Sequence, residues 1–453
     1  MQSARSRALA ALFASVLAAC GGGGGDGDAG NPGPGGSASA GGSPPAASGP
    51  VAGGAPAPAP APGAPAPAPA AFSAFGPTVI AESTTGPSPA VARLTTGGSA
   101  AAYAAERDQL LVRRFAAAGA AVGDALVVHG TAGQNVGAFA MAPTSDGGFV
   151  VFWAVEATAN QSVLSLRARR YGADGSLQWD SRVSDTLFNS ISDLAVRQAA
   201  NGDILLGWSG TLARSGMSSV FVQRLSAAGA PQGAAVNPQG PFGDRDQVSL
   251  VPLPDGTLVI VWRQRDDSAR TYSAYFQRFG SDLQPSAAPL QVRGSAGGQA
   301  IAVGAAARAD GNVAIGWGTQ TGTGESMVHL VVITPAGDTT VPVFSTSSTW
   351  PVTDVEVVPL AEQGFALVWQ DERAGPRETT ATLWMQRFDA TGAPAGSPQQ
   401  LDARIVQWVS PVTGAFGAVN PGFDADGGAD GHLVGTFHRA AEGDRGNTLL
   451  FGR

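Results

Sequence analysis

The sequence of 453 residues predicts an all-β fold, a seven-bladed β-propeller. Three observations lead to this prediction. A turn followed by an apolar strand with an aromatic end recurs seven times, a second strand pattern follows most copies, and no window shows sustained helical periodicity. Successive turn glycines lie 50 to 55 residues apart, except for a last interval of 67. These glycines are Gly97, Gly147, Gly202, Gly256, Gly311, Gly364 and Gly431.

The first recurring element is clearest in DGTLVIVW (residues 255–262) and DGNVAIGW (residues 310–317). Asp-Gly and Asn-Gly turns beside such apolar runs are strong hairpin signals. A large side chain at one fixed point of every repeat most simply fills the interface between neighbouring units, and a ligand-binding role is the alternative. The seven aromatic residues at this point are Tyr103, Trp153, Trp208, Trp262, Trp317, Trp369 and Phe437.

The second recurring element is a strand that ends in RRY, QRL or QRF, as in LRARRY (to Tyr171) and LWMQRF (to Phe388). A turn and a short strand follow it, and a weaker strand such as SDLAVRQ (residues 192–198) precedes the first element. Each unit therefore offers four short strands joined by tight turns, which is typical of a propeller blade. An immunoglobulin-like sandwich would need about 100 residues and seven strands per domain.

The two ends of the repeat region predict how the ring closes. The chain ends at Arg453, directly after the third strand of the last unit, so this unit lacks its fourth strand. The segment PTVIAES (residues 77–83) precedes the first unit and can supply that strand, which would remove two exposed sheet edges. We therefore expect seven blades over residues 73–453, with six or eight as the alternative if an end unit is misassigned.

The unit WQDERAG…LWMQRFDATGAPAG (residues 369–396) resembles a repeat of secreted bacterial proteins, W-x-D-x-R-x-G…Q-R-[FL]-D-x-x-G. The resemblance extends more weakly from about residue 84 to the C-terminus and implies a propeller without specifying a function. A single partial match, ADGSLQW (residues 173–179), is similar to the repeats of quinoprotein-like propellers, which include an outer-membrane assembly lipoprotein.

The N-terminal segment MQSARSRALAALFASVLAAC predicts export with a lipid anchor. Two arginines precede an apolar run of about a dozen residues, which is too short to span a bilayer. The run ends in LAAC (residues 17–20), which resembles the lipobox of bacterial lipoproteins, and Cys20 is the one cysteine of the chain. The resemblance implies a signal peptide over residues 1–19 and acylation of Cys20, for example with palmitate. Gly21 in place of Asp implies sorting to the outer membrane, and an ordinary secretory signal is the alternative.

Residues 20–72 predict a disordered tether between this anchor and the propeller. The segment is almost entirely Gly, Ala, Pro and Ser, which offers too little apolar surface for a core. The run APAPAPAPGAPAPAPA (residues 55–70) favours a semi-rigid polyproline II spacer of roughly 50 Å.

Composition excludes one class of partner. The formal net charge is −8, and no basic face or stripe is evident, so we expect no nucleic-acid binding. A single cysteine rules out an intramolecular disulfide. We expect a monomer, and no sequence motif indicates a cofactor.

The sequence offers no catalytic constellation. The four histidines, His129, His329, His432 and His438, lack a zinc-like spacing, and there is no nucleophile elbow, phosphate-binding loop or C-x-x-C motif. The acidic string Asp424, Asp426 and Asp430 in DADGGADG is a candidate calcium site, because carboxylates and loop carbonyls are the preferred ligands of calcium. The alternative is a plain Asp-Gly turn in a long insertion within the one widened interval.

The sequence-based hypothesis for function is a membrane-anchored envelope lipoprotein whose propeller binds or scaffolds a protein, peptide or glycan partner. The alternatives are a propeller enzyme of the glycosidase or lyase type, or an outer-membrane assembly factor. Carboxylates that converge in the channel would favour hydrolysis over binding.

The lipid anchor can be tested at Cys20. Because acyl chains would be the only membrane attachment, Cys20→Ala should release the protein from the membrane fraction and abolish acyl labelling. Fractionation with a labelled fatty acid measures both. A variant that stays membrane-bound without the label would contradict the anchor.

Overall fold

The structure is a computed structural model, and it describes residues 74–453 with gaps. The sequence predictions for residues 1–19, Cys20 and the tether over residues 20–72 lie outside the described residues. The gaps are residues 85–86, 158–161, 185–187, 214–215, 239–244, 267–270, 293–298, 309, 321–325, 336, 338–343, 361–363, 376–377, 390–391, 410–415, 419–421, 429 and 441–445.

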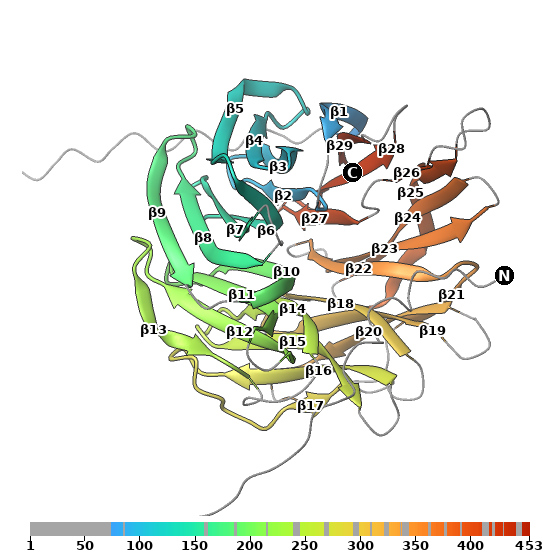
Figure 1. Cartoon of the computed structure of the whole chain (residues 1–453). Helices are drawn as coiled ribbons and strands as arrows, with labels where there is room; N and C mark the ends of the chain where they lie inside the picture. The colour runs from blue at the N-terminus through green and yellow to red at the C-terminus, as the bar shows by residue number, and fades with distance from the viewer. Residues whose placement is uncertain are drawn as a thin grey trace, which may run out of the picture. The chain divides into compact units, whose positions relative to one another are not determined.

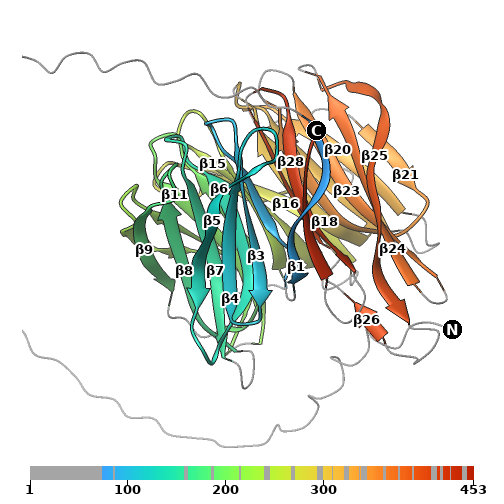
Figure 2. The ribbon, with the colours of Figure 1, turned by 90° about the horizontal axis from the view of Figure 1, so that it is seen from above.

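The described residues form an all-β ring of seven antiparallel blades around a central channel (Figures 1 and 2). In the first six blades the strands follow one another in sequence order from the channel outward, four in each of the first five blades and five in the sixth, and the seventh blade takes its fourth strand from the N-terminal side of the repeats. This arrangement confirms the predicted fold. A single bridge between Phe188 and Val163 also links two neighbouring blades. In the part of the chain that the structure describes there is no helix, and so none that is long and apolar enough to cross a membrane.

The innermost strands line the channel, and the second strands carry the recurrent aromatics. In blade order the innermost strands are β2 (Ala90–Arg93), β6 (Gln134–Pro143), β10 (Phe188–Gln198), β14 (Arg245–Pro252), β18 (Gln299–Ala307), β22 (Val352–Pro359) and β27 (Phe423–Gly427). The second strands are β3 (Ser99–Glu106), β7 (Phe149–Ala157), β11 (Ile204–Leu212), β15 (Leu258–Asp266), β19 (Val313–Gln320), β23 (Phe365–Ala374) and β28 (Leu433–Ala440).

The third and outermost strands complete the blades. The third strands are β4 (Gln109–Phe115), β8 (Val163–Tyr171), β12 (Ser218–Leu225), β16 (Thr271–Phe279), β20 (Ser326–Ile333), β24 (Glu378–Phe388) and β29 (Gly446–Gly452). The fourth strands of the first six blades, outermost in all but the sixth, are β5 (Ala121–Gly130), β9 (Leu177–Ser184), β13 (Pro231–Val236), β17 (Leu290–Gln291), β21 (Phe344–Ser348) and β25 (Pro394–Val409).

The N-terminal strand closes the ring, as the sequence predicts. Strand β1 (Phe75–Thr84) pairs antiparallel with β29 and becomes the outermost strand of the seventh blade. Figure 1 shows this blue strand beside the red strands of the C-terminus. The last blade is thus built from both ends of the repeat region, so the edge of β29 is covered.

The predicted turn glycines all have backbone angles that favour glycine. Each closes the first hairpin of its blade with a φ between 77° and 101°, a left-handed region in which other residues are strained. The hairpins connect the innermost strand to the second strand at one pole of the ring.

The core consists of seven hydrophobic clusters, and each lies between two neighbouring blades. All seven recurrent aromatics are buried, with one in each cluster on the side that faces the preceding blade. Most also stack on a cross-strand neighbour, as Trp208 does on Phe221 with ring centroids 5.6 Å apart. The recurrent aromatic therefore packs between blades.

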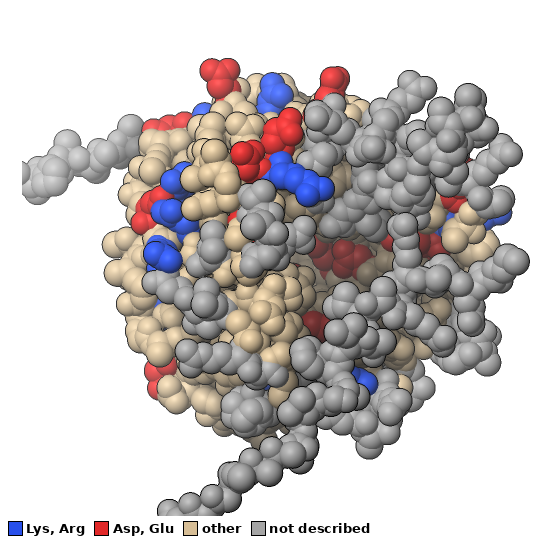
Figure 3. Space-filling model, in the orientation of Figure 1, with Lys and Arg blue, Asp and Glu red and all other residues tan. Residues whose placement is uncertain are grey.

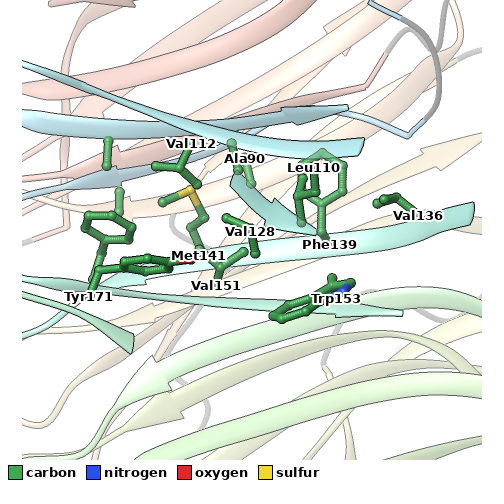
Figure 4. Packing of buried hydrophobic residues seen from close by; sticks show 14 of the residues in the cluster. Ala90, Leu110, Val112, Val128, Val136, Phe139, Met141, Val151, Trp153 and Tyr171 are labelled. Atoms are coloured by element: carbon green, nitrogen blue, oxygen red, sulfur yellow. The ribbon is translucent and has the colours of Figure 1, made fainter. Parts of the chain in front are cut away.

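Figure 4 shows the interface between the first two blades. Trp153 and Met141 from the second blade meet Leu110, Val112 and Val128 from the first blade. All of these side chains are at most 3% exposed, so the two sheets bury their facing surfaces against each other.

The recurrent arginine of the third strand links neighbouring blades by hydrogen bonds. The guanidinium groups of Arg114, Arg170 and Arg278 donate to the carbonyls of Ala173, Ala227 and Thr334 in the next blade. In the sixth blade Arg387 donates to the Gly431 carbonyl over 2.9 Å. These bonds give the arginine of the RRY and QRF motifs a structural role.

The widened interval of the repeat belongs to the sixth blade. Its fourth strand β25 has 16 residues and pairs with a short fifth strand, β26 (Phe416–Ala418). The segment DADGGADG (residues 424–431) is therefore not an insertion loop, because it begins in the innermost strand β27 and ends in the hairpin turn. The Asp-Gly turn expected from the sequence is present at Asp430 and Gly431, but its placement in a long insertion was wrong.

Ring closure can be tested with two neighbouring residues of β1. Ile80 is 4% exposed in the cluster between the seventh and first blades, whereas Val79 is 46% exposed. Ile80→Ala should lower the free energy of unfolding by about 2–4 kcal/mol, because it removes packing from this cluster. Val79→Ala should change it by less than about 0.5 kcal/mol. Equal effects in chemical denaturation would contradict the closure by β1.

Candidate functional site

The central channel holds a pocket of about 400 Å³. Each first hairpin is closed by a hydrogen bond over four residues, such as Leu94 N–H to Gly98 C=O. The residue four positions before the donor, here called the channel position, lines the pocket in every blade. The seven channel positions are Ala90, Ala140, Ala195, Ser249, Gly304, Glu356 and Asp424.

The pocket lies toward the beginnings of the innermost strands, away from the Asp-Gly turns. A second cavity of about 360 Å³ follows toward the turns and shares Arg197, Ala305 and Val357 with the pocket. Because the strands alternate in direction, the connections from second to third strands and from blade to blade lie at the pocket's pole. Longer connections at this pole can therefore shape the pocket without disturbing the core.

Acidic side chains gather in the pocket. Asp193 from β10, Asp354 and Glu356 from β22 and Asp424 from β27 line it together with one cation, Arg197. Figure 3 shows acidic side chains inside the hollow near the centre of this face. Residues that lie more than 200 positions apart in the chain thus share one cavity.

Several of these carboxylates connect one blade to the next. Asp193 accepts a hydrogen bond from the Val248 N–H (2.7 Å), and Glu356 accepts one from the Ala425 N–H (2.7 Å). Asp424 accepts one from the Val91 N–H (2.6 Å) across the closure of the ring. An innermost strand has no further strand to pair with, so these side chains satisfy N–H groups at its open edge.

The side chains of Glu356 and Asp424 are hydrogen-bonded to each other in the pocket wall. Burial, followed by the charges of Asp424 and Asp354, raises the pKa of Glu356 well above its usual value. Burial also raises the pKa of Asp424 to about 7, while the Val91 N–H and Arg197 oppose the shift. Both carboxyl groups therefore resist ionisation, and the pair retains a proton at a higher pH than two separate, solvated carboxyl groups would.

Gly304 allows β18 and β22 to approach closely beside this pair. A Cβ at Gly304 would lie 2.8 Å from both the Glu356 Cα and the Val355 carbonyl oxygen, so no larger residue fits. The glycine thereby fixes the backbone from which Glu356 extends into the pocket.

Two further carboxyl groups in the pocket have raised pKa values. Burial raises the pKa of Asp193 to about 7, and the charge of Asp354 adds to the shift. Burial raises the pKa of Asp354 to about 6, against the hydrogen bonds from the Val355 and Phe423 N–H groups. Carboxyl groups that titrate near neutral pH in an open cavity are suited to proton transfer.

The three calcium candidates have other partners. Asp424 takes part in the pair described above, and Asp426 accepts a hydrogen bond from the Arg93 N–H over 2.8 Å. Asp430 forms an ion pair with the Arg93 guanidinium over 2.7 Å. Over the described ranges no three His, Cys, Asp or Glu side chains form a group that could hold a metal ion.

Three of the four histidine side chains contact other residues of the propeller. His129 lies against the Gln134 carbonyl, and His329 stacks on Trp317 with ring centroids 5.0 Å apart. His438 is 2% exposed with Nε2 3.0 Å from the Pro87 carbonyl oxygen, and burial lowers its pKa to about 4. The backbone N–H of His432 donates to Asp430 in a hairpin turn.

Sequence reasoning found no clustered acids and missed Asp193, Asp354 and Glu356. An alignment of the seven repeats on the hydrogen bond that closes each first hairpin would have given a signal, because it places Glu356 and Asp424 at the same repeat position. The other five blades have Ala, Ser or Gly there. Two acids where small residues are the rule indicate a local specialisation of the sixth and seventh blades.

No family model and no curated protein matches the chain. Among solved structures, a PL25 polysaccharide lyase, an ulvan lyase bound to -[GlcA(1-4)Rha3S]-, is 10% identical with a TM-score of 0.48, over 84% of this chain and 96% of that one. A protein of unknown function from Dyadobacter fermentans is 11% identical with a TM-score of 0.48, over 83% and 98%. An α-L-arabinanase of Penicillium chrysogenum complexed with arabinobiose is 11% identical with a TM-score of 0.46, over 83% and 98%. None of these similarities assigns a role to a residue of this chain.

The raised carboxyl pKa values predict a pH dependence of stability. An unfolded aspartate ionises near pH 4, whereas folded Asp424 has a pKa of about 7. Between these values the folded state holds a proton that the unfolded chain has lost. The free energy of unfolding should therefore fall as the pH rises from about 4 to about 7, by roughly 1–3 kcal/mol relative to Asp424→Asn. Denaturation of both proteins from pH 4.5 to 8 measures the difference, and identical pH profiles would contradict it.

Proposed function

We propose that this propeller is a glycan-acting protein of the glycosidase or lyase type, with its reaction centre in the channel pocket. The observation that carries the proposal is that Glu356 and Asp424, from two different blades, lie together in the wall of a cavity of about 400 Å³, where burial raises the pKa of both carboxyl groups. Cleavage of a glycosidic bond needs such a proton donor, because the leaving oxygen must be protonated as its bond breaks. Of the functions expected from the sequence, this geometry favours the enzymatic alternative.

The pocket supplies a donor and an acceptor of protons for hydrolysis. Glu356 gives its proton to the glycosidic oxygen as the bond from the anomeric carbon breaks. Water adds to the anomeric carbon and gives a proton to the Asp193 or Asp354 carboxylate, and solvent then restores both groups. Arg197, the one cation of the lining, can hold a sugar hydroxyl through its donors.

The charge of the pocket favours a neutral or basic glycan. Four carboxyl groups and one guanidinium line the cavity, so a polyanionic chain would meet repulsion at short range. Sugar hydroxyl groups, by contrast, donate hydrogen bonds to carboxylates. The preferred substrate class is therefore a neutral glycan or an amino-sugar glycan.

We also propose that Cys20 is acylated and holds the propeller at the cell envelope, at the outer membrane. The motif at residues 17–20 and the Gly- and Pro-rich segment that follows it support this placement. A tethered propeller could then reach glycans at the envelope surface.

The proposed activity is tested with Glu356→Gln, which keeps the shape of the side chain and removes its proton chemistry. On a neutral or amino-sugar oligosaccharide that the full-length protein cleaves, kcat/KM should fall by about 100-fold or more, while binding by calorimetry persists. The exposed Asp124 on the outermost strand β5 provides a matched carboxylate control, and Asp124→Asn should leave both unchanged. A panel of neutral, basic and anionic glycans of which none is bound or cleaved would contradict the proposal.

A non-enzymatic glycan-binding module is the second candidate. Asp193, Glu356 and Asp424 each accept a backbone N–H from the next blade, so these carboxylates also have a purely structural use. Binding without turnover in the same panel would favour this candidate over the enzyme.

A further inference from the structure

An exposed aromatic ring precedes the innermost strand of the sixth blade, which lines the channel pocket. Trp350, in the connection between β21 and β22, is 38% exposed and is the one aromatic among the large exposed hydrophobic residues of the described chain. It precedes Thr353, a lining residue of the pocket, by three positions. The tryptophans at the recurrent position are buried between blades, whereas Trp350 lies outside the recurrent position and is exposed.

The segment that carries Trp350 is held on both sides. The neighbouring Pro351 carbonyl accepts a hydrogen bond from the Glu372 N–H over 3.0 Å. Two positions before Trp350, Ser348 donates to Asp371 over 2.7 Å, and the Trp384 indole N–H donates to the same carboxylate oxygen over 3.2 Å. The ring is thus displayed on a fixed backbone, which lowers the entropic cost of binding a ligand there.

Arg373 holds the ring from β23. Its guanidinium carbon lies 5.1 Å from the centroid of the Trp350 ring, a cation–π distance. The pair therefore offers an apolar aromatic surface with hydrogen-bond donors beside it. The C–H face of a pyranose ring stacks on such a surface, while its hydroxyl groups accept bonds from the donors.

Strand β23 links the Trp350 segment to the wall of the pocket. The Gln370 amide donates to the Thr353 hydroxyl over 3.1 Å, and both residues line the pocket. Asp371 and Glu372, which hold the Trp350 segment, follow Gln370 directly along β23. A ligand that leaves the pocket over this blade would therefore meet Trp350 next.

We propose that Trp350 and Arg373 form an outer subsite that binds a second sugar unit of the glycan whose neighbouring units occupy the pocket. This inference rests on the proposed glycan-directed function. It adds that the substrate is an oligosaccharide or polysaccharide chain, and that the chain runs from the pocket across the sixth blade.

The test uses a ladder of oligosaccharides of a glycan that the full-length protein binds, from one to six units, with affinities measured by calorimetry. Trp350→Ala should weaken binding of the longer members by about tenfold and leave the shortest members unchanged. Trp350→Phe should recover part of the loss. Leu290→Ala, on the outermost strand β17 and 48% exposed, removes an exposed apolar side chain elsewhere and should have no effect.

The outcomes separate the subsite from the function on which it rests. Unchanged affinity of Trp350→Ala for every length, in a protein whose Glu356→Gln variant loses turnover, would overturn the subsite alone. A uniform loss across all lengths would also overturn it, because it would indicate damage to the pocket. If the unsubstituted protein binds no member of any ladder, the proposed glycan-directed function is contradicted, and the subsite that rests on it is contradicted as well. If the protein binds no glycan but captures a protein ligand, and Trp350→Ala abolishes that capture, the result would overturn the sugar subsite and indicate a protein partner instead.

Discussion

Each blade of this propeller has two apolar faces, and only the neighbouring blades cover them. The core is therefore divided into seven clusters, none of which belongs to a single blade. An open ring would expose two of these faces to water, which makes closure a condition for stability. The pairing of β1 with β29 and the packing of Ile80 meet this condition at the junction of the last and first blades.

The same ring leaves seven innermost strands with an open edge toward the channel. Polar side chains of one blade satisfy N–H groups of the next, and at the closure this is done by Asp424 and Asp426. Placing carboxylates there brings them together in a confined cavity, which raises their pKa values. The structural solution at the open edge thus also creates groups that can transfer protons near neutral pH.

The sixth blade departs furthest from the common plan. It carries Asp354 and Glu356 on its innermost strand, Trp350 in the connection that precedes it, and a long fourth strand with β26 added. The inter-blade packing of this blade is nevertheless ordinary, with Trp369 in its cluster like the aromatic of every other blade. The unusual residues of this blade therefore lie in the channel and at one pole, and the packing of the core does not depend on them.

The sequence by itself determined the blade number, the recurrent aromatics, the turn glycines and the closing strand. These features depend on local patterns, namely strand periodicity and turn chemistry, which repeat with the blade and can be read along the chain. Only the tertiary structure decided which acids meet in the channel. Asp193, Glu356 and Asp424 come from three different blades, and the ring geometry brings them into one pocket. The sequence showed Asp424 beside Asp426 and Asp430 and suggested a calcium loop, whereas pairing in space joins Asp424 to Glu356 and Asp430 to Arg93. The reason is that proximity in a closed ring depends on the register between blades, which no single repeat contains.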